Sequence, residues 1–256
     1  MTGRVEGRVA IVTGAAAGGI GAAYARGLAE QGASVVLADL NFEGASTVAK
    51  ELVHDGLRAS AVHLDVTSED SAQACAEHTL ATFGGLDILV NNAGLYAEVP
   101  KTPLTEVSLE LYDAVHRVNV LGPLICTRAV VPHMKANGGG KIVNQASTMA
   151  FRPGGLYRIS KHALVGLTAS LGVELAPYNI NVNAIAPGMI ASEASYRAAG
   201  LVGSDKRRSS YDAIPNARPD RSPADLVGTL LLLASDDGDF INGQTISVDG
   251  GMVIRL

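Results

Sequence analysis

The sequence of 256 residues predicts an α/β fold, and two patterns near its start carry that prediction. A β-branched run at residues 9–13 leads into a glycine-rich turn, and Ile20, Tyr24 and Leu28 follow at helical spacing. A second apolar run ends in Asp39. A strand, a glycine-rich turn, a helix and a strand with an acidic end together form the opening of a dinucleotide-binding βαβ unit.

The glycine-rich turn has the features of a site for an anionic pyrophosphate. Glycines let backbone N–H groups approach a ligand closely, and the following helix directs the positive end of its dipole at the same point. The alternative is a turn that only packs the helix against the sheet. Because strand, turn and helix occur in the order that phosphate binding requires, we expect four residues of the turn to contact a cofactor: Gly14, Gly19, Ile20 and Gly21.

Asp39 predicts a preference for NAD over NADP. An acidic residue at this strand end hydrogen-bonds the adenosine ribose hydroxyls. It repels a phosphate on that ribose, by roughly 4 kcal/mol for unit charges about 4 Å apart at a surface-like dielectric. Residues 15–18 contain no Arg or Lys, and none follows Asp39 directly, so nothing reverses the preference. The alternative is a solvated loop aspartate.

Composition indicates one soluble domain spanning residues 1–256, because no linker or charge block divides the chain. The net charge of −5 argues against nucleic acid as a partner, and the largest basic cluster is Lys206-Arg207-Arg208. That cluster either meets an anionic group or forms a solvated loop face.

Two further features favour a cytoplasmic protein that does not enter a membrane. Cys75 and Cys126 lie in helical patterns, which predicts buried free thiols in a reducing compartment. The N-terminus has no signal-peptide pattern, and the most apolar stretch, residues 226–234, is too short to span a bilayer.

The remaining elements alternate along the chain. We expect Thr67 to cap the helix that ends near Phe83, and the long helical segment at 108–137 to bend at Gly122-Pro123. The other predicted elements are a helix around 45–52, strands at 59–64, 86–90, 141–145, 180–184 and 244–248, and helices at about 157–175 and 223–235.

Tyr157 and Lys161 lie one helical turn apart on the same face of a predicted helix. A tyrosine hydroxyl has a reference pKa near 10, and an ammonium within about 4–6 Å lowers it by roughly one to three units. That would make the hydroxyl a general base at neutral pH. Such a pair also occurs by chance in many helices, so the prediction depends on the motifs that occur with it. Ser147 follows the preceding strand, at the sheet edge where ligands bind.

Several motifs occur in the order found in the short-chain dehydrogenase/reductase family, which the chain resembles from Arg8 to about Met252. They are Thr13-Gly14 with Gly19-Ile20-Gly21, Asn91-Asn92-Ala93-Gly94 after a strand, Asn119 in the long helix, Ser147, Tyr157 with Lys161, Pro187-Gly188 and Asp249-Gly250-Gly251. The glycine-rich turn contains one residue more than the usual pattern. This leaves open whether Gly18 or Gly19 contacts the pyrophosphate.

The resemblance implies a Rossmann-type, doubly wound three-layer sandwich with a seven-stranded, mostly parallel sheet. It also implies four catalytic roles. Tyr157 is the acid/base, and Ser147 hydrogen-bonds the substrate oxygen, with Thr148 as its substitute because the Ser147–Tyr157 loop is short. Lys161 lowers the tyrosine pKa and binds the nicotinamide ribose. Asn119 completes a proton relay, although a buried amide that bends a helix would have the same sequence signal.

The cofactor implied by the resemblance is NAD. Beyond the four turn residues, the predicted cofactor contacts are Asp39, Asp65, Val66, Asn92, Ala93, Gly94, Tyr157, Lys161, Pro187, Gly188, Ile190 and Ser192. Asp65 is almost as well explained as a simple turn residue. His63, His116 and His133 are scattered, so no metal site is expected.

The predicted reaction is hydride transfer between NAD(H) and a small secondary alcohol or ketone. The alternatives are a reductase of carrier-bound or CoA-bound 3-oxoacyl chains, and an NAD-binding regulator without catalysis. The polar segment at about 189–217 is expected to be a substrate lid. Family resemblance also predicts a homotetramer.

Overall fold

The computed structural model describes residues 3–16, 18–191 and 222–254. Within them, seven strands form one sheet in the order β3-β2-β1-β4-β5-β6-β7, and every neighbouring pair is parallel. The expected sheet was mostly parallel. The strands are β1 (Val9–Thr13), β2 (Ser34–Asp39), β3 (Ala59–His63), β4 (Ile88–Asn91), β5 (Gly140–Gln145), β6 (Ile180–Pro187) and β7 (Thr245–Val248).

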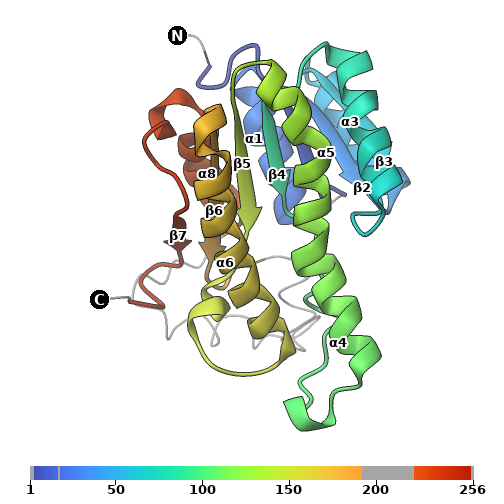
Figure 1. Ribbon diagram of the computed structural model, residues 1–256. Coiled ribbons are helices and arrows are strands. Elements are labelled where there is room, and N and C mark those ends of the chain that lie inside the picture. Colours follow the sequence, from blue (N-terminus) through green and yellow to red (C-terminus); the bar gives the residue numbers. More distant parts are fainter. Residues whose placement is uncertain (1–2, 17, 192–221, 255–256) are drawn as a thin grey trace.

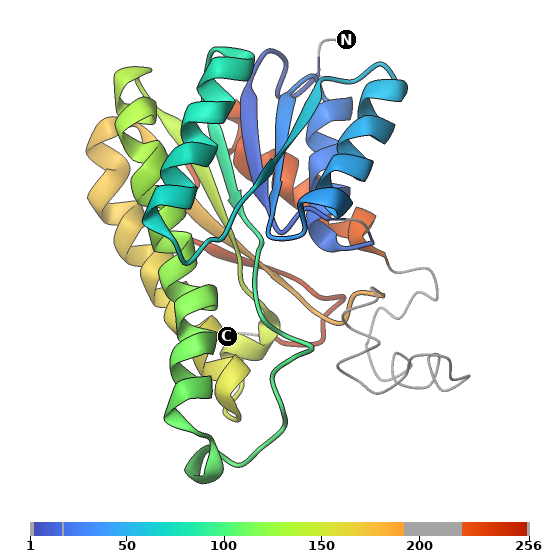
Figure 2. The same cartoon turned by 90° about the vertical axis from the view of Figure 1, so that its right-hand side faces the viewer.

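Helices cover both faces of this sheet and complete the predicted three layers (Figures 1 and 2). One face carries α1 (Ile20–Glu30), α2 (Phe42–His54) and α8 (Val227–Ala234), and the other carries α3 (Glu69–Phe83), α5 (Gly122–Ala136) and α6 (Leu156–Leu175). The short helix α4 (Leu109–His116) extends beyond the carboxyl ends of the strands (Figure 1). Strand order reverses between β1 and β4, the point where doubly wound sheets bind ligands.

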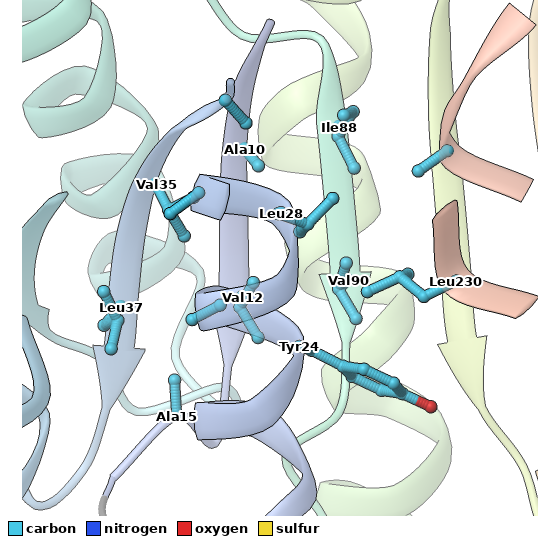
Figure 3. Close-up of a cluster of buried hydrophobic side chains, with 14 of the residues drawn as sticks. Ala10, Val12, Ala15, Tyr24, Leu28, Val35, Leu37, Ile88, Val90 and Leu230 are labelled. Carbon is cyan, nitrogen blue, oxygen red and sulfur yellow. The ribbon is translucent and has the colours of Figure 1, made fainter. Parts of the chain in front are cut away.

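The apolar spacing that predicted the first helix has a direct structural cause. Figure 3 shows Tyr24 and Leu28 leaving α1 toward the strands, close to Val12 and Val90. These side chains are fully buried, and Leu230 of α8 joins the same cluster. Each such aliphatic side chain contributes about 1.5–3 kcal/mol by leaving water, so α1 and its glycine-rich turn are fixed against β1 and β4.

The predicted cap of the third helix is wrong by one residue. Ser68, not Thr67, is the N-cap of α3, and its Oγ accepts a hydrogen bond from Ser71 N at 3.2 Å. The Thr67 hydroxyl instead donates to Asp65 Oδ1 at 2.8 Å. Because the Thr67 hydroxyl is hydrogen-bonded to Asp65, the hydroxyl of Ser68 caps the helix.

The regular helix is interrupted by a short π-helical segment, Arg117–Leu121, directly before Gly122-Pro123, where we expected the bend. Pro123 has no N–H to donate, and π-helical turns recur at functional sites. Asn119 lies in this segment and is fully buried. Short 3₁₀ turns connect other elements, and one at Pro223–Leu226 opens the last predicted helix. No helix of the described residues is both long and apolar enough to cross a membrane.

Candidate active site

The ends of β1 and β4 are joined by a ring of hydrogen bonds that uses the Asn-Asn-Ala-Gly motif. Thr13 Oγ1 accepts from the backbone N–H groups of Asn92 and Ala93, both at 3.0 Å. The Asn92 side chain donates from Nδ2 to the carbonyls of Thr13 and Gly14, at 3.0 and 2.9 Å. Asn92 therefore fixes the glycine-rich turn from the neighbouring strand.

The glycines of the turn serve different purposes. Gly14 has φ +66°, and a Cβ there would lie 2.7 Å from the Ala93 Cα; a Cβ on Gly21 would lie 2.2 Å from the Gly14 carbonyl oxygen. Gly18 has φ +81°. Gly19 is the N-cap of α1 and gives the helix no side-chain cap, and a Cβ there would meet nothing nearer than 4.0 Å. Packing therefore requires Gly14 and Gly21, whereas Gly19 borders open space before the helix.

Asp39 fastens the turn to the end of β2. Its Oδ2 accepts from Ala16 N at 2.9 Å and its Oδ1 from Asn41 N at 2.8 Å. The turn is also held by Gly14 N, which donates to the Ala38 carbonyl at 2.8 Å. The carboxylate is partly exposed, so it remains open to a ligand beside the turn.

Asp65 acts in a turn, as the simpler interpretation of this residue expects. Its Oδ1 accepts from Thr67 N at 2.9 Å and from the Thr67 hydroxyl. These hydrogen bonds, the backbone one first, lower the pKa of the Asp65 carboxyl. Val66 packs beneath Gly122, where a Cβ would lie 2.9 Å from a Val66 methyl. The turn after β3 thus packs against the start of α5, directly after the π-helical segment that contains Asn119.

A buried polar network joins β4, β5 and α6. Asn91 Nδ2 donates to Asn144 Oδ1 at 2.9 Å and to the Pro123 carbonyl at 3.3 Å, and Asn144 Nδ2 donates to Thr168 Oγ1 at 3.0 Å. Asn91 Oδ1 is buried without a partner among the described residues. Asn91 therefore braces the sheet, and the network sets α6 against the strand ends.

Asn119 holds the loop after β4 to α6. Its Oδ1 accepts from Leu95 N at 2.7 Å, and its Nδ2 donates to the Leu95 carbonyl and to Ser160 Oγ, both at 3.0 Å. Ser160 in turn donates to the Tyr157 carbonyl at 2.8 Å. The amide therefore uses both of its N–H donors and accepts one hydrogen bond within one turn of the predicted Tyr157–Lys161 pair.

The structure brings Ser147, Tyr157 and Lys161 together. The Lys161 ammonium is buried, lies 5.8 Å from the centre of the Tyr157 ring and donates to the Gln145 carbonyl at 2.7 Å. Ser147 lies beside the Tyr157 hydroxyl, and its Oγ accepts a hydrogen bond from Met149 N at 3.2 Å. Thr148, the predicted substitute, is buried and donates to the Pro187 carbonyl at 3.1 Å. Ser147 is therefore the residue beside Tyr157.

The pKa of Tyr157 moves opposite to the direction expected from Lys161. Burial raises the pKa of Tyr157 well above its usual 10, Ser147 opposes this by hydrogen bonding, and Tyr96 adds to it. Burial also lowers the pKa of Lys161 to about 8. Lys161 does not offset this burial: its ammonium lies 5.8 Å from the centre of the Tyr157 ring and donates to the Gln145 carbonyl.

The loop after β6 lies at the same sheet edge. Gly188 N donates to the Val248 carbonyl at 3.0 Å, and a Cβ on Gly188 would lie 2.7 Å from the Asp249 Cβ. The Ile190 side chain packs in the apolar cluster of α1 and α8, so its backbone alone is available to a ligand. Ser192, the Lys206-Arg207-Arg208 cluster and most of the predicted lid at 189–217 lie outside the described residues.

Three residues of the site were not predicted. Tyr96 packs its ring 4.7 Å from that of Tyr157, Ser160 links Asn119 to the Tyr157 backbone, and Gln145 supplies the carbonyl that anchors Lys161. Ser160 could have been found from its three-residue spacing to Tyr157. Gln145 was visible as a polar residue at the end of an apolar strand, whereas the Tyr96 contact has no local signal.

The predicted thiols are free and buried, and burial raises the pKa of both Cys75 and Cys126 to about 12. The described residues contain no group of three or more His, Cys, Asp or Glu side chains that could hold a metal ion.

The chain has close relatives along nearly its whole length. A family model described as enoyl-(acyl carrier protein) reductase matches residues 14–253. The sorbitol dehydrogenase of Cereibacter sphaeroides is 40% identical over 97% of this chain and 98% of that protein.

Solved structures with nicotinamide cofactors are also similar. A 7α-hydroxysteroid dehydrogenase complexed with NADH has a TM-score of 0.89 and 33% identity, covering 99% of this chain and 97% of its own. A Beutenbergia cavernae structure with bound NADP has a TM-score of 0.86 and 37% identity, covering 96% and 97%. Both forms of the cofactor therefore occur among the structural relatives.

Proposed function

The chain belongs to the short-chain dehydrogenase/reductase family, and we propose that it transfers a hydride between NAD(H) and a secondary alcohol or ketone with Tyr157 as general acid/base. It is an oxidoreductase that acts on a CH–OH group and uses a nicotinamide cofactor. The class of non-catalytic NAD-binding regulators is therefore set aside.

One observation carries the assignment of roles. The Tyr157 hydroxyl meets Ser147, its backbone carbonyl is held through Ser160 by Asn119, and Lys161 lies beside its ring. A positioned hydroxyl with a second hydrogen-bonding side chain next to it is the arrangement that general acid/base catalysis at a carbonyl requires. We therefore assign catalytic roles to Asn119, Ser147, Tyr157 and Lys161.

The residues at the start of α1 fit a pyrophosphate. The first N–H groups of a helix have no partner within it, and α1 gives them no side-chain cap. Gly14 and Gly18 adopt left-handed backbone conformations, and Gly19 leaves the approach open. Gly19 is thus our choice for the pyrophosphate contact. The remaining cofactor contacts are assigned to Gly14, Ile20, Gly21, Asp39, Asp65, Val66, Asn92, Ala93, Gly94, Tyr157, Lys161, Pro187, Gly188, Ile190 and Ser192.

Asp39 supports NAD over NADP. Its carboxylate is held in place by two backbone N–H groups at the end of β2. A ribose with free hydroxyls can donate to a carboxylate, whereas a phosphate on that ribose would be repelled by it.

The cofactor, when bound, accepts the hydride in alcohol oxidation and supplies it in ketone reduction. Tyr157 donates a proton to the substrate oxygen in reduction and takes it back in oxidation, while Ser147 hydrogen-bonds the same oxygen. Because burial raises the pKa of Tyr157, the hydroxyl is kept protonated at neutral pH, which suits proton donation. Lys161 would bind the nicotinamide ribose, and Asn119 would belong to the relay that returns the proton to solvent.

The substrate is a small alcohol or ketone, of the polyol or cyclic alcohol kind. The sorbitol dehydrogenase named above and a cis-4-hydroxycyclohexanecarboxylate dehydrogenase of Sinomonas cyclohexanicum, 41% identical, support this choice. A 3-oxoacyl-thioester reductase is the second candidate. The description of the matching family model supports it only in naming acyl carrier protein, because the enoyl group named there is reduced at a C=C bond and not at a ketone.

We also propose a homotetramer of single-domain subunits in the cytoplasm, each with residues 189–217 as a substrate lid. Large apolar side chains are exposed on α4 and the following segment at Leu109, Tyr112 and Leu121, and on α6 at Val173. Sedimentation velocity tests the assembly, and a purely monomeric protein would overturn it.

The test is the formation of NADH from NAD and, separately, of NADPH from NADP, followed by absorbance. Substrates should include sugar alcohols, cyclic alcohols and 3-hydroxyacyl thioesters. We expect turnover with NAD on a polyol or cyclic alcohol. Asp39→Ala should lower the ratio of kcat/KM with NAD to kcat/KM with NADP. Glu43→Ala, which removes a nearby exposed carboxylate, is the matched control. Turnover with thioesters alone would favour the second candidate.

A further inference from the structure

We propose that Tyr24 and Gln145 form a positioning pair that fixes the place of the Lys161 ammonium. Tyr24 belongs to α1, on the face of the sheet opposite to α6, which carries Lys161. The hydroxyl of Tyr24 donates to Gln145 Oε1 at 2.8 Å, and the backbone carbonyl of the same Gln145 accepts from the Lys161 ammonium at 2.7 Å. Both hydrogen bonds are buried. Tyr24 thus acts on Lys161 through one residue at the end of β5.

The geometry of a strand explains how one residue can serve both faces. Successive side chains of a strand point to opposite faces. Asn144 donates to Thr168 of α6, whereas Gln145 reaches Tyr24 of α1. The end of β5 is therefore clamped from both sides immediately before Ser147.

The anchor matters because Lys161 has few other partners. An ammonium has three N–H donors, and within the described part of the chain its hydrogen bond goes to the Gln145 carbonyl. The position of a buried ammonium with one carbonyl acceptor therefore depends on that acceptor. Any shift of the end of β5 therefore changes the distance between the lysine charge and the Tyr157 hydroxyl.

Tyr24 also has the properties of a permanent donor. It is fully buried one turn into α1, and burial raises the pKa of its hydroxyl, so the phenol stays neutral across the physiological range. Its helix begins directly after Gly19, where we place the pyrophosphate contact. The pair therefore connects the helix of the cofactor phosphates to the lysine of the nicotinamide ribose.

The inference rests on the proposed function, since it assigns a role through Lys161. The first variant is Tyr24→Phe, which removes one hydroxyl and leaves Gln145 Oε1 without its donor. The second is Tyr24→Phe with Gln145→Met, which removes the Tyr24 hydroxyl and the whole Gln145 amide, so no acceptor is left buried without its donor. Thr79→Val is the control, because Thr79 donates to the Cys75 carbonyl at 2.8 Å, is fully buried and belongs to α3.

Two readouts separate positioning from stability. The first is the acid limb of kcat/KM against pH for alcohol oxidation. The second is the absorbance titration of the Tyr157 phenolate with NAD present, taken as the difference from Tyr157→Phe. A less well placed ammonium supports the phenolate less, so both Tyr24 variants should shift each midpoint to higher pH by about one unit, a roughly tenfold loss below it. Thr79→Val should lose thermal stability with both midpoints unmoved.

The outcomes distinguish the two hypotheses. The double variant should recover thermal stability and keep the shifted midpoints. Wild-type midpoints in that variant, or an equal shift in Thr79→Val, would overturn the positioning role. An inactive wild-type enzyme across the substrate panel would overturn the proposed function instead, and the phenolate titration would still decide whether Tyr24 acts on Tyr157.

Discussion

The two ends of strand β5 each hold a lysine ammonium, but in opposite electrostatic settings. Lys141, near the amino end, donates to Asn181 Oδ1 at 2.7 Å and pairs with the carboxylate of Asp239, which is 67% exposed. Lys161 donates to the Gln145 carbonyl at the carboxyl end, and no carboxylate of the described residues lies within ion-pair distance. The same strand therefore meets one compensated charge and one uncompensated charge.

The difference shows that this fold tolerates a destabilising buried charge at the carboxyl end of β5. A buried ammonium without a counter-charge is destabilised, and burial lowers the pKa of Lys161 to about 8 for that reason. Perturbed groups of this kind gather at functional sites because the charge serves a ligand rather than the fold. The amino end of the sheet carries ion pairs at the surface, such as Arg4 with Asp237 and Arg8 with Asp236, which contribute little to stability.

The largest expected effect is at the carboxyl end. Tyr157→Phe keeps the ring contact with Tyr96 and removes the proton donor, so kcat should fall by about 10²–10⁴-fold. Dissociation constants for NADH, measured by fluorescence titration, should stay within a few-fold of wild type. Tyr178→Phe, on a half-exposed ring beside Lys135, is the matched control and should retain full activity. Full turnover by the Tyr157 variant would contradict the view that the carboxyl end of β5 is the functional end.

The next effect is the pH dependence of stability that Lys161 creates. The lysine pKa is near 10.5 when unfolded and about 8 when folded, so the unfolded state binds more protons between these values. The contribution of Lys161 to stability therefore rises with pH from about 8 to 10.5, by roughly 3 kcal/mol at most. Lys161→Met removes the buried charge. Its unfolding free energy should exceed that of wild type at pH 7, and the excess should shrink as pH rises through this window.

Denaturant unfolding of both proteins at several pH values measures this difference directly. Taking the difference cancels the groups that the two proteins share, including the cysteines with raised pKa values. A gap that stays constant across the window would mean that Lys161 has the same proton affinity in both states. The uncompensated charge would then carry no cost.

Sequence patterns predicted the parts of this comparison that depend on local spacing. The Tyr157–Lys161 pair, the strands and the glycine-rich turn all follow from one helical turn, a β-branched run or a backbone requirement. The anchor of Lys161 is a backbone carbonyl 16 residues away, and carbonyls have no sequence signature. The direction of the Tyr157 pKa shift was missed because burial, which spacing cannot give, outweighs the charge four residues on.

A substitution in the glycine-rich turn tests whether the carboxyl end of the sheet is sensitive to added side-chain volume as well as to changes of charge. Gly21→Ala places a Cβ 2.2 Å from the Gly14 carbonyl oxygen and 2.6 Å from Asn92 Nδ2, so strand β1 or helix α1 must move. Overpacking of this kind costs about 1–3 kcal/mol, and NAD affinity should fall with it. Gly228→Ala is the control, since a Cβ there in α8 meets nothing within 4 Å and a helical alanine should stabilise. Equal effects of the two substitutions on thermal unfolding would contradict the steric argument.

The smallest effect belongs to the amino end of β5. Lys141→Met keeps the apolar stem of the side chain and removes the charge, which leaves Asp239 solvated and Asn181 Oδ1 without its donor. The loss should be about 1 kcal/mol, because an ion pair with an exposed partner is screened and the asparagine is near water. Denaturant unfolding at low and high salt measures it, and the difference from wild type should diminish as salt rises. Activity and its pH profile should not change, because this ammonium is at the far end of the strand from Tyr157. A loss as large as that of a buried ion pair, about 3–5 kcal/mol, would place both lysines in the same class and end the distinction between the two ends of the strand.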